Sequence, residues 1–179
     1  MSDQAIADPQ ATAVPVWARN LPQRAFVVLF GKTGSGKTST AYDGIMKLIQ
    51  YGHTVTSLEQ DTPEVFVRAT KEAAEFGLTQ ETLAKMFKHT QVAYQHSHVM
   101  AMPDLYFLGD LRGVDESTHQ RIQIGINAAS SRKSALATVH AATLEQARQV
   151  FNDLLEMNGL KDEASSTVFI FHECVRTAD

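Results

Sequence analysis

The chain has 179 residues, 44% apolar and 20% charged, which is ordinary for one globular domain. A formal net charge of −4 gives no support for nucleic-acid binding, which calls for a basic face. No apolar run approaches the roughly 20 residues that span a bilayer, the N-terminus lacks the pattern of a secretory signal, and the single cysteine excludes an internal disulfide. These features favour a cytoplasmic protein.

Residues 1–20 show no periodicity and are predicted to form an irregular N-terminal tail, followed by one domain over residues 21–179. The domain opens with Phe26–Phe30, five consecutive apolar residues that predict a strand buried on both faces. A glycine-rich segment follows, and apolar residues then recur at helical spacing from Ser39 to Ile49. The predicted order is therefore strand, glycine loop and helix.

The glycine-rich segment reads GKTGSGKT over residues 31–38 and matches G-x-x-x-x-G-K-T, the phosphate-binding P-loop. In such a loop, backbone N–H groups and the N-terminus of the following helix bind phosphate oxygens. Lys37 is expected to reach the β- and γ-phosphates, and Thr38 to place its hydroxyl on Mg²⁺. The predicted nucleotide-binding residues are Gly31, Lys32, Thr33, Gly34, Ser35, Gly36, Lys37, Thr38 and Ser39. Trp17 is expected to pack on the domain, with stacking on the nucleobase as the alternative.

The rest of the chain alternates between predicted strands and predicted helices. The strands are predicted at 54–58, 104–110, 135–139 and 167–172, with a strand at 92–94 left open. The helices are predicted at 63–76 with Thr62 as N-cap, at 79–87, at 116–129, and at 144–157 with Thr143 and Gln146 as a capping box. This alternation predicts an α/β fold with a mostly parallel sheet and helices on both of its faces.

Four chemically active segments follow the ends of predicted strands: the P-loop, the acidic stretch from Glu59 to Glu64, Asp110 and His140. Ligands on parallel sheets bind at the carboxyl ends of the strands, so we expect these segments to meet at one rim. Asp110 is the expected second Mg²⁺ ligand beside Thr38, because a strand-end acid and the P-loop hydroxyl hold the metal of a nucleoside triphosphate. The alternative is an exposed acid without a role.

For several candidate catalytic residues, the sequence alone leaves two interpretations open. Glu59, Asp61 and Glu64 either position a water or favour the start of a helix electrostatically, and the same choice applies to Asp115 and Glu116. His140 is either a γ-phosphate sensor or a structural residue. Candidates for stabilising transition-state charge, in the same subunit or in a neighbouring one, are Arg112, Arg121, Arg132 and Arg148, each otherwise a surface group.

The chain resembles the type II/type IV secretion and type IV pilus ATPases, a branch of the RecA-like P-loop motors, from about Arg24 to Val175. The resemblance rests on the P-loop and on three further motifs: DTPEV at 61–65, similar to the acidic box of the family; PDLYFLGDLRG at 103–113, similar to its Walker B; and TVHA at 138–141, similar to its histidine box. It implies ATP hydrolysis with Mg²⁺ in a hexameric ring, catalytic roles for Asp110, Asp61, Glu64, His140 and Arg112, and partners in a secretion, conjugation or pilus machine at the inner membrane. Glu59, just before the acidic box, is a further catalytic candidate on the residues alone.

Two departures from that family matter. The family has a glutamate at the position of Asp110, and its usual N-terminal domain has no counterpart in this sequence. They favour, as the alternative to an ATP-hydrolysing motor subunit, an ATP-binding assembly or regulatory subunit that does not hydrolyse. A GTPase or a small-molecule kinase is a further alternative, although the sequence has neither a guanine-reading Asn-Lys-x-Asp pattern nor an arginine-rich lid.

Overall fold

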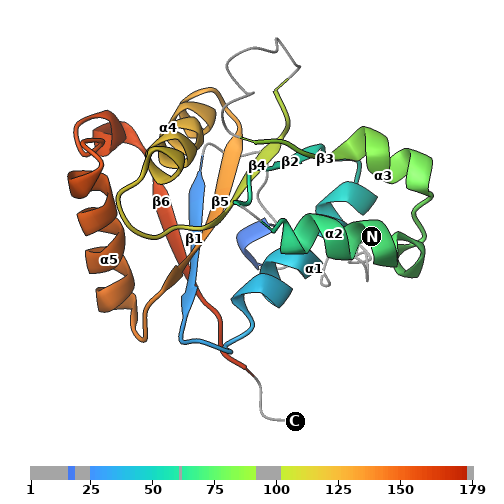
Figure 1. Cartoon of the computed structure of the whole chain (residues 1–179), viewed down its shortest axis with the longest axis horizontal. Helices are drawn as coiled ribbons and strands as arrows, with labels where there is room; N and C mark the ends of the chain where they lie inside the picture. The colour runs from blue at the N-terminus through green and yellow to red at the C-terminus, as the bar shows by residue number, and fades with distance from the viewer. Residues whose placement is uncertain (1–15, 19–24, 61, 92–101, 177–179) are drawn as a thin grey trace, which may run out of the picture.

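The computed structural model describes residues 16–18, 25–60, 62–91 and 102–176, which form a six-stranded sheet between two layers of helices (Figure 1). The strand order is β3-β2-β4-β5-β1-β6, and all pairings among the described strands are parallel. The strands are β1 Phe26–Gly31, β2 Val55–Ser57, β3 Phe87–His89, β4 Leu105–Asp110, β5 Ser134–His140 and β6 Phe169–Glu173. The predicted fold class is confirmed.

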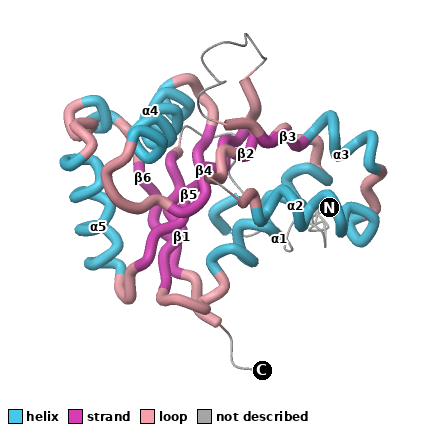
Figure 2. The backbone as a smooth tube through the Cα atoms, viewed as in Figure 1, coloured by secondary structure: helices cyan, strands magenta, loops and turns pink. Residues whose placement is uncertain are grey.

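The helices cover both faces of the sheet (Figure 2). One layer consists of α1 Lys37–Gln50, α2 Glu64–Glu72 and α3 Gln80–Met86, and the other of α4 Glu116–Ser130 and α5 Leu144–Met157. Short 3₁₀ turns lie at Val16–Ala18, Ala73–Phe76 and Glu163–Ser166. Among the described residues, no helix combines the length and the apolar character that crossing a membrane would require.

Strand β1 shows why the apolar run at 26–30 is continuous. All six of its residues are buried, and successive side chains pack into opposite layers. Val27 and Leu29 belong to the core beneath α1, α2 and α3, whereas Phe26, Val28 and Phe30 belong to the core beneath α4 and α5. A central parallel strand with helices on both faces needs apolar residues at every position, not at alternate positions.

Most predicted element boundaries agree with the structure, and one exception lies at Phe87. Phe87 was expected to end a helix, but α3 ends at Met86 and Phe87 begins β3, where it pairs with Val55. Thr143 is confirmed as the N-cap of α5, because its Oγ1 accepts a hydrogen bond from Gln146 N at 3.2 Å. The reciprocal bond of the predicted capping box is shifted by one residue, since Gln146 Oε1 accepts from Ala142 N at 2.9 Å. The strand that was left open at 92–94 lies outside the described residues.

Trp17 packs on the domain, as expected. Its indole lies against Gly44 of α1, where an added Cβ would come within 2.0 Å of Trp17 Cζ2. The side chain is 6% exposed and belongs to the core beneath α1. This position leaves the alternative, stacking on a bound base, without support. The boundary between tail and domain near residue 20 stays a prediction.

The parallel register brings the ends of four strands to one rim. Gly31, the last residue of β1, is paired with His140 at the end of β5, and Asp110 at the end of β4 is paired with Thr138. The loop after β2 begins beside β4, because Ser57 pairs with Phe107. The sheet therefore places the P-loop, the acidic stretch, Asp110 and His140 at the same carboxyl-end edge.

Candidate active site

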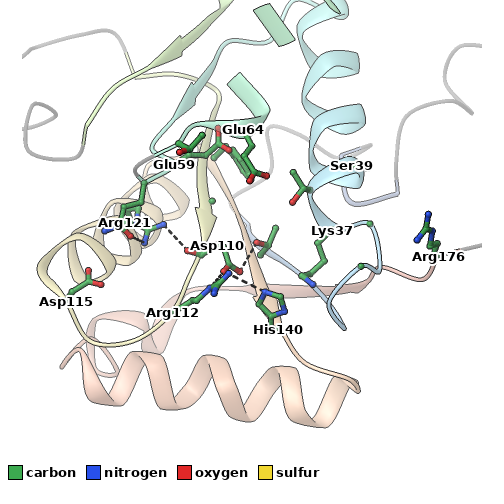
Figure 3. A pocket seen from close by; sticks show the side chains of 18 residues that line it. Lys37, Ser39, Glu59, Glu64, Asp110, Arg112, Asp115, Arg121, His140 and Arg176 are labelled. Carbon is green, nitrogen blue, oxygen red and sulfur yellow. Dashed lines mark hydrogen bonds and ion pairs between the residues drawn. The ribbon is translucent and has the colours of Figure 1, made fainter. Parts of the chain in front are cut away.

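A cleft of about 870 Å³ opens at this carboxyl-end rim (Figure 3). The residues that line it come from the P-loop, from the loop between β2 and α2, from the ends of β4 and β5, from α4 and from the segment after β6. They are Gly34, Gly36, Lys37, Thr38, Ser39, Glu59, Gln60, Thr62, Glu64, Phe107, Gly109, Asp110, Arg112, Asp115, Arg121, Thr138, His140 and Arg176. The predicted convergence of four segments on one rim is confirmed as geometry.

The P-loop presents the start of α1 to the cleft. Gly36 occupies the N-cap position with φ +86°, and among the described residues no side chain caps this helix end. The first backbone N–H groups of α1 are therefore available to an anion. Of the nine residues predicted to bind nucleotide, those that line the cleft are Gly34, Gly36, Lys37, Thr38 and Ser39, and those that do not are Gly31, Lys32, Thr33 and Ser35.

Lys37, the first residue of α1, is a buried cation with 7% of its surface exposed. Its Nζ donates hydrogen bonds to the carbonyl oxygens of Gly31 and Lys32, each at 2.9 Å. Burial lowers the pKa of Lys37, and the nearby Asp110 and Cys174 oppose that shift. A phosphate group that reached Nζ would therefore meet a partly desolvated charge, which binds an anion more strongly than an exposed one.

Asp110 is directed by the glycine that precedes it. Gly109 has φ +73°, and the pairing of β4 with β5 shifts register between Phe107 and Gly109. Such a bulge in a strand re-aims the side chain that follows. Gly109 also lies against the main chain and side chain of Glu59, since an added Cβ would sit 3.3 Å from both Glu59 Cα and Glu59 Cγ. The bulge thus places Asp110 and Glu59 on neighbouring walls of the cleft.

The carboxylate of Asp110 is the point where three predicted site residues meet. Thr138 Oγ1 donates to Asp110 Oδ1 at 3.2 Å, and Arg112 Nε donates to Asp110 Oδ2. His140 Nε2 lies 3.8 Å from the same Oδ2. Figure 3 shows Arg112 and His140 directed toward Asp110 from different elements. The structure therefore brings together Asp110, Arg112 and His140, with Thr138 as a partner that the sequence analysis did not single out as a separate site residue.

Glu59 is held on three sides. Its Oε1 accepts a hydrogen bond from Val65 N at 3.0 Å, and its Oε2 accepts from Phe66 N at 3.3 Å and from Ser57 Oγ at 2.8 Å. Burial raises the pKa of Glu59, and these hydrogen bonds, with His89 nearby, act in the opposite direction. Glu59 is thus a partly buried carboxylate with a fixed orientation.

The start of α2 corrects one expectation. Thr62 was predicted to cap this helix, but α2 begins at Glu64 with Pro63 at its N-cap position. The first free N–H groups of α2 are instead satisfied by Glu59, six and seven residues earlier in the chain. Glu64 lines the cleft from the first turn of α2, and Asp61 lies outside the described residues.

The four candidate arginines separate into three situations. Arg112 reaches over the cleft with 72% of its side chain exposed. Arg121 is 1% exposed, and its Nη1 donates to the carbonyl oxygens of Leu108 at 2.6 Å and Asp110 at 3.1 Å. Arg132, in the turn before β5, and Arg148, on α5, do not line the cleft. The structure therefore does not support a role for either arginine in stabilising transition-state charge within its own subunit.

Asp115 is a helix cap. Its Oδ1 accepts a hydrogen bond from Thr118 N at 2.7 Å, at the N-terminus of α4. Of the two interpretations left open by the sequence, the geometry supports stabilisation of the helix start. Glu116 lies in the first turn of the same helix and does not line the cleft.

Thr138, Gln60 and Arg176 are among the residues of the cleft that were not predicted as site residues. Thr138 lies two positions before His140 on one strand, a spacing that places both side chains on the same face and was the available signal. Gln60 lines the cleft, and its Oε1 accepts from Arg121 Nη2 at 3.3 Å. Arg176 enters from the segment after β6, and no local pattern marks it.

The residues of the cleft fit a magnesium ion bound together with phosphate. The hydroxyl of Thr38 and the carboxylate of Asp110 line the same cleft, and Mg²⁺ prefers oxygen ligands. In the part of the chain that the structure describes, no group of three or more His, Cys, Asp or Glu side chains is arranged to hold a metal alone. Mg²⁺ commonly takes only one or two protein ligands and completes its shell with substrate oxygens and water.

No protein-family model and no curated protein sequence matches the chain. Solved structures do resemble it. The ATPase DotB of Legionella pneumophila superimposes with a TM-score of 0.57 at 18% identity over 92% of this chain and 46% of its own. The VirB11 ATPase from the Brucella suis type IV secretion system, in complex with sulphate, gives 0.51 at 21% identity over 84% of this chain and 43% of its own.

A structure of a different kind is similar to the same degree. The KaiC-like protein PH0186 from the archaeon Pyrococcus horikoshii OT3 has a TM-score of 0.55 at 18% identity, over 79% of this chain and 74% of its own. The chain spans less than half the length of DotB and VirB11. At these identities the likeness concerns the fold alone, and it agrees with the parallel α/β sheet and the P-loop described above.

Proposed function

We propose that the chain is an ATP-binding and ATP-hydrolysing subunit. The observation that carries the proposal is the convergence on one cleft of Lys37 at the start of α1, Asp110 at the end of β4 and Glu59 in the loop after β2. The P-loop supplies an uncapped helix N-terminus and a partly desolvated ammonium, and the other two residues supply carboxylates. This set matches the needs of phosphoryl transfer, in which positioning and charge stabilisation do most of the work.

The phosphates would occupy the P-loop side of the cleft. The N-terminus of α1 and Lys37 Nζ bind the β- and γ-phosphate oxygens, and Nζ exchanges its two carbonyl partners for phosphate. Thr38 and Asp110 are the residues that would hold Mg²⁺, which neutralises charge on the β- and γ-oxygens when it is bound. Arg112 and His140, beside Asp110, then lie on the γ-phosphate side of the cleft.

Glu59 is the proposed base. A carboxylate offers roughly four acceptor positions, and the three donors on Glu59 leave one for a water molecule. The water oxygen attacks the γ-phosphorus, its proton passes to Glu59, and the bond from the γ-phosphorus to the bridging oxygen breaks to release ADP and phosphate. Burial, which raises the pKa of Glu59, makes it a better proton acceptor than an exposed carboxylate.

The wider role that we propose is that of a motor subunit in a secretion, conjugation or type IV pilus machine. The four motifs at 31–38, 61–65, 103–113 and 138–141 support it, as does the likeness to DotB and VirB11. A homo-oligomer, hexameric by the same resemblance, would work at the cytoplasmic side of the inner membrane. An open cleft with Arg112 and Arg176 at its edges suits a nucleotide shared between neighbouring subunits.

The ion pair between Arg112 and Asp110 favours a second candidate function. Arg112 Nε occupies Asp110 Oδ2, the oxygen that a metal would need. A subunit in which this ion pair persisted would bind ATP without turning it over. The alternative is therefore an ATP-binding assembly or regulatory subunit.

ATP turnover measured against protein concentration, together with solution mass by light scattering, tests the proposal. We expect specific activity to rise as oligomers form, and Asp110→Asn to lose turnover while ATP binding is retained. Tight ATP binding without turnover at any concentration would favour the regulatory alternative. Clear selectivity for GTP would overturn the choice of ATP.

Lys37→Ala tests the P-loop assignment directly. We expect nucleotide affinity and turnover to fall by about a hundredfold, because a partly buried charge that meets the phosphates is removed. Lys161→Ala, an exposed lysine paired with Glu156 away from the cleft, serves as the control and should change neither. Turnover of Lys37→Ala equal to the wild type would refute the mechanism.

A further inference from the structure

Ser57 and His89 are polar residues that do not line the cleft and are connected to Glu59 by hydrogen-bond contacts. We propose that Ser57 and His89 are positioning residues: His89 orients the Ser57 hydroxyl, and that hydroxyl holds the Glu59 carboxylate in place to accept a proton from the attacking water. This inference rests on the proposed function for its kinetic consequences. Its structural part stands independently.

The three side chains form a continuous chain of contacts between two neighbouring strands. Ser57, the last residue of β2, is fully buried and pairs in register with His89, the last residue of β3. Ser57 Oγ lies 2.8 Å from Glu59 Oε2 and 3.4 Å from His89 Nδ1. Glu59 N also donates to Ser57 Oγ at 3.3 Å. The Phe66 ring lies beside the imidazole, with 5.6 Å between the ring centroids.

Counting protons fixes the direction of these hydrogen bonds. A serine hydroxyl has one proton to donate and two lone pairs that accept. An ionised Glu59 only accepts, so Ser57 must give its proton to Oε2. Ser57 then has no proton left for His89, and the contact with Nδ1 requires a proton on Nδ1. The geometry therefore assigns to the neutral ring of His89 the Nδ1–H tautomer.

The charged and titratable groups around Glu59 come from four elements. His89 approaches from β3, Glu64 lies at the start of α2, Asp110 follows Gly109 on β4, and Arg121 on α4 reaches the same loop through Gln60. Among the described residues, Ser57 is the side-chain hydroxyl hydrogen-bonded to the Glu59 carboxylate. Without it, Oε2 would keep only the longer bond from Phe66 N, the ionised form would lose a donor, and the pKa of Glu59 would rise.

The tautomer of His89 tests the structural part without any assay of activity. Long-range ¹H–¹⁵N correlation spectra of the ¹⁵N-labelled full chain distinguish the two ring nitrogens. We expect the Nδ1–H form in the wild type and a change in the tautomer ratio in Ser57→Ala. A neutral ring that carries its proton on Nε2 would overturn the proposal, because Ser57 would then donate to His89 and not to Glu59.

Kinetics of four variants test the positioning role. We expect Ser57→Ala to lower kcat about tenfold and His89→Ala about threefold, with the KM for ATP unchanged, since a positioning residue affects the chemical step. In both variants the acid limb of the pH profile of kcat should move to higher pH. His89→Asn, which can place an amide N–H near the position of Nδ1, should recover most of the loss. Thr56→Ala is the matched control, because Thr56 precedes Ser57 on β2 and its side chain lies on the opposite face of the sheet.

The double variant Ser57→Ala/His89→Ala tests whether His89 acts through Ser57 or whether the two residues act independently. Because His89 acts through Ser57, His89→Ala should add almost nothing in the Ser57→Ala background. Additive losses, or an acid limb that stays in place, would overturn the proposal. If the wild type turns over no nucleoside triphosphate, the proposed function fails. In that case the tautomer measurement and the titration of the Glu59 carboxyl by NMR still decide whether Ser57 and His89 hold this carboxylate.

Discussion

Gly109 lies directly against Glu59: a Cβ added at Gly109 would sit 3.3 Å from both Cα and Cγ of Glu59. Gly109 also has φ +73°, a conformation that other residues adopt at a cost of roughly 1–2 kcal/mol. The glycine before the acid therefore has two functions. It allows the bulge that turns Asp110 into the cleft, and it leaves room for Glu59 on the neighbouring wall.

Gly109→Ala is expected to impair both stability and turnover. The strained φ should lower the free energy of unfolding by about 1 kcal/mol, and the methyl group should displace Glu59 by a few tenths of an ångström and lower kcat about tenfold. Urea unfolding and steady-state kinetics measure the two effects. Gly77→Ala is the control, because Gly77 has φ +68° with open space around it, so it should lose similar stability and keep full activity. Equal kcat values in both variants would contradict the role of the contact.

The sequence predicts the rim well because the relevant signals are local. A strand, a glycine loop and a helix follow one another within residues 26–50, and parallel strands must end at one edge. Once β4 and β5 are predicted as strands, Asp110 and His140 are predicted to lie at the cleft, because each is the last residue of its strand. The packing of Trp17 on the domain was also predicted, although its contact with Gly44 of α1 was not.

The support behind Glu59 was not accessible from sequence patterns. Glu59 caps α2 across a loop of irregular backbone, so no capping motif of fixed spacing describes it. The contact between Ser57 and His89 depends on β3, a strand of only three residues. The helical spacing of apolar residues in α3 continues to Phe87, so the sequence predicts a helix where β3 begins. Arg121 reads as a surface residue of a helix, and only the packing of α4 on β4 shows it to be buried.

Thr138→Val should weaken magnesium binding selectively. The substitution preserves shape and removes the hydroxyl that donates to Asp110 Oδ1 at 3.2 Å. Loss of an outer partner of a metal ligand commonly costs 10–100-fold in affinity, so we expect the Mg²⁺ concentration for half-maximal turnover to rise about tenfold, with kcat at saturating Mg²⁺ little changed. Titration of turnover with Mg²⁺ measures this. Thr56→Val is a control on another strand, and an unchanged Mg²⁺ dependence in Thr138→Val would count against Asp110 as a metal ligand.

Two arginines near Asp110 should behave in opposite ways. Arg121→Met leaves the buried carbonyl oxygens of Leu108 and Asp110 without this donor, which should lower the free energy of unfolding by about 2–4 kcal/mol.

Arg112→Ala removes an exposed side chain, so stability should change by about 0.5 kcal/mol or less. Turnover should nevertheless fall about a hundredfold if Arg112 stabilises charge on the γ-phosphate. Arg112→Ala with full turnover would leave that role to a residue from a neighbouring subunit.

Glu59→Gln should change how stability depends on pH. Burial raises the pKa of Glu59 in the folded protein, so between the pKa of the unfolded chain and the raised pKa the folded protein holds more of this proton. Stability then falls as pH rises through that window, and the contribution present at low pH is lost above it. Glutamine carries no charge and lacks this contribution. The wild type should therefore lose stability relative to Glu59→Gln as the pH rises above the ordinary glutamate pKa of about 4.3 and through the raised pKa of the folded protein.

Urea unfolding of the wild type and Glu59→Gln at a series of pH values measures that difference, and all other titrating groups cancel in the comparison. We expect the variant to gain on the wild type as pH rises and to have lost turnover at every pH. A difference that stays constant would mean that the folded protein does not perturb this carboxyl. A difference of the opposite sign would mean that the donors from Ser57, Val65 and Phe66 outweigh burial, so that Glu59 binds a proton too weakly to serve as the base.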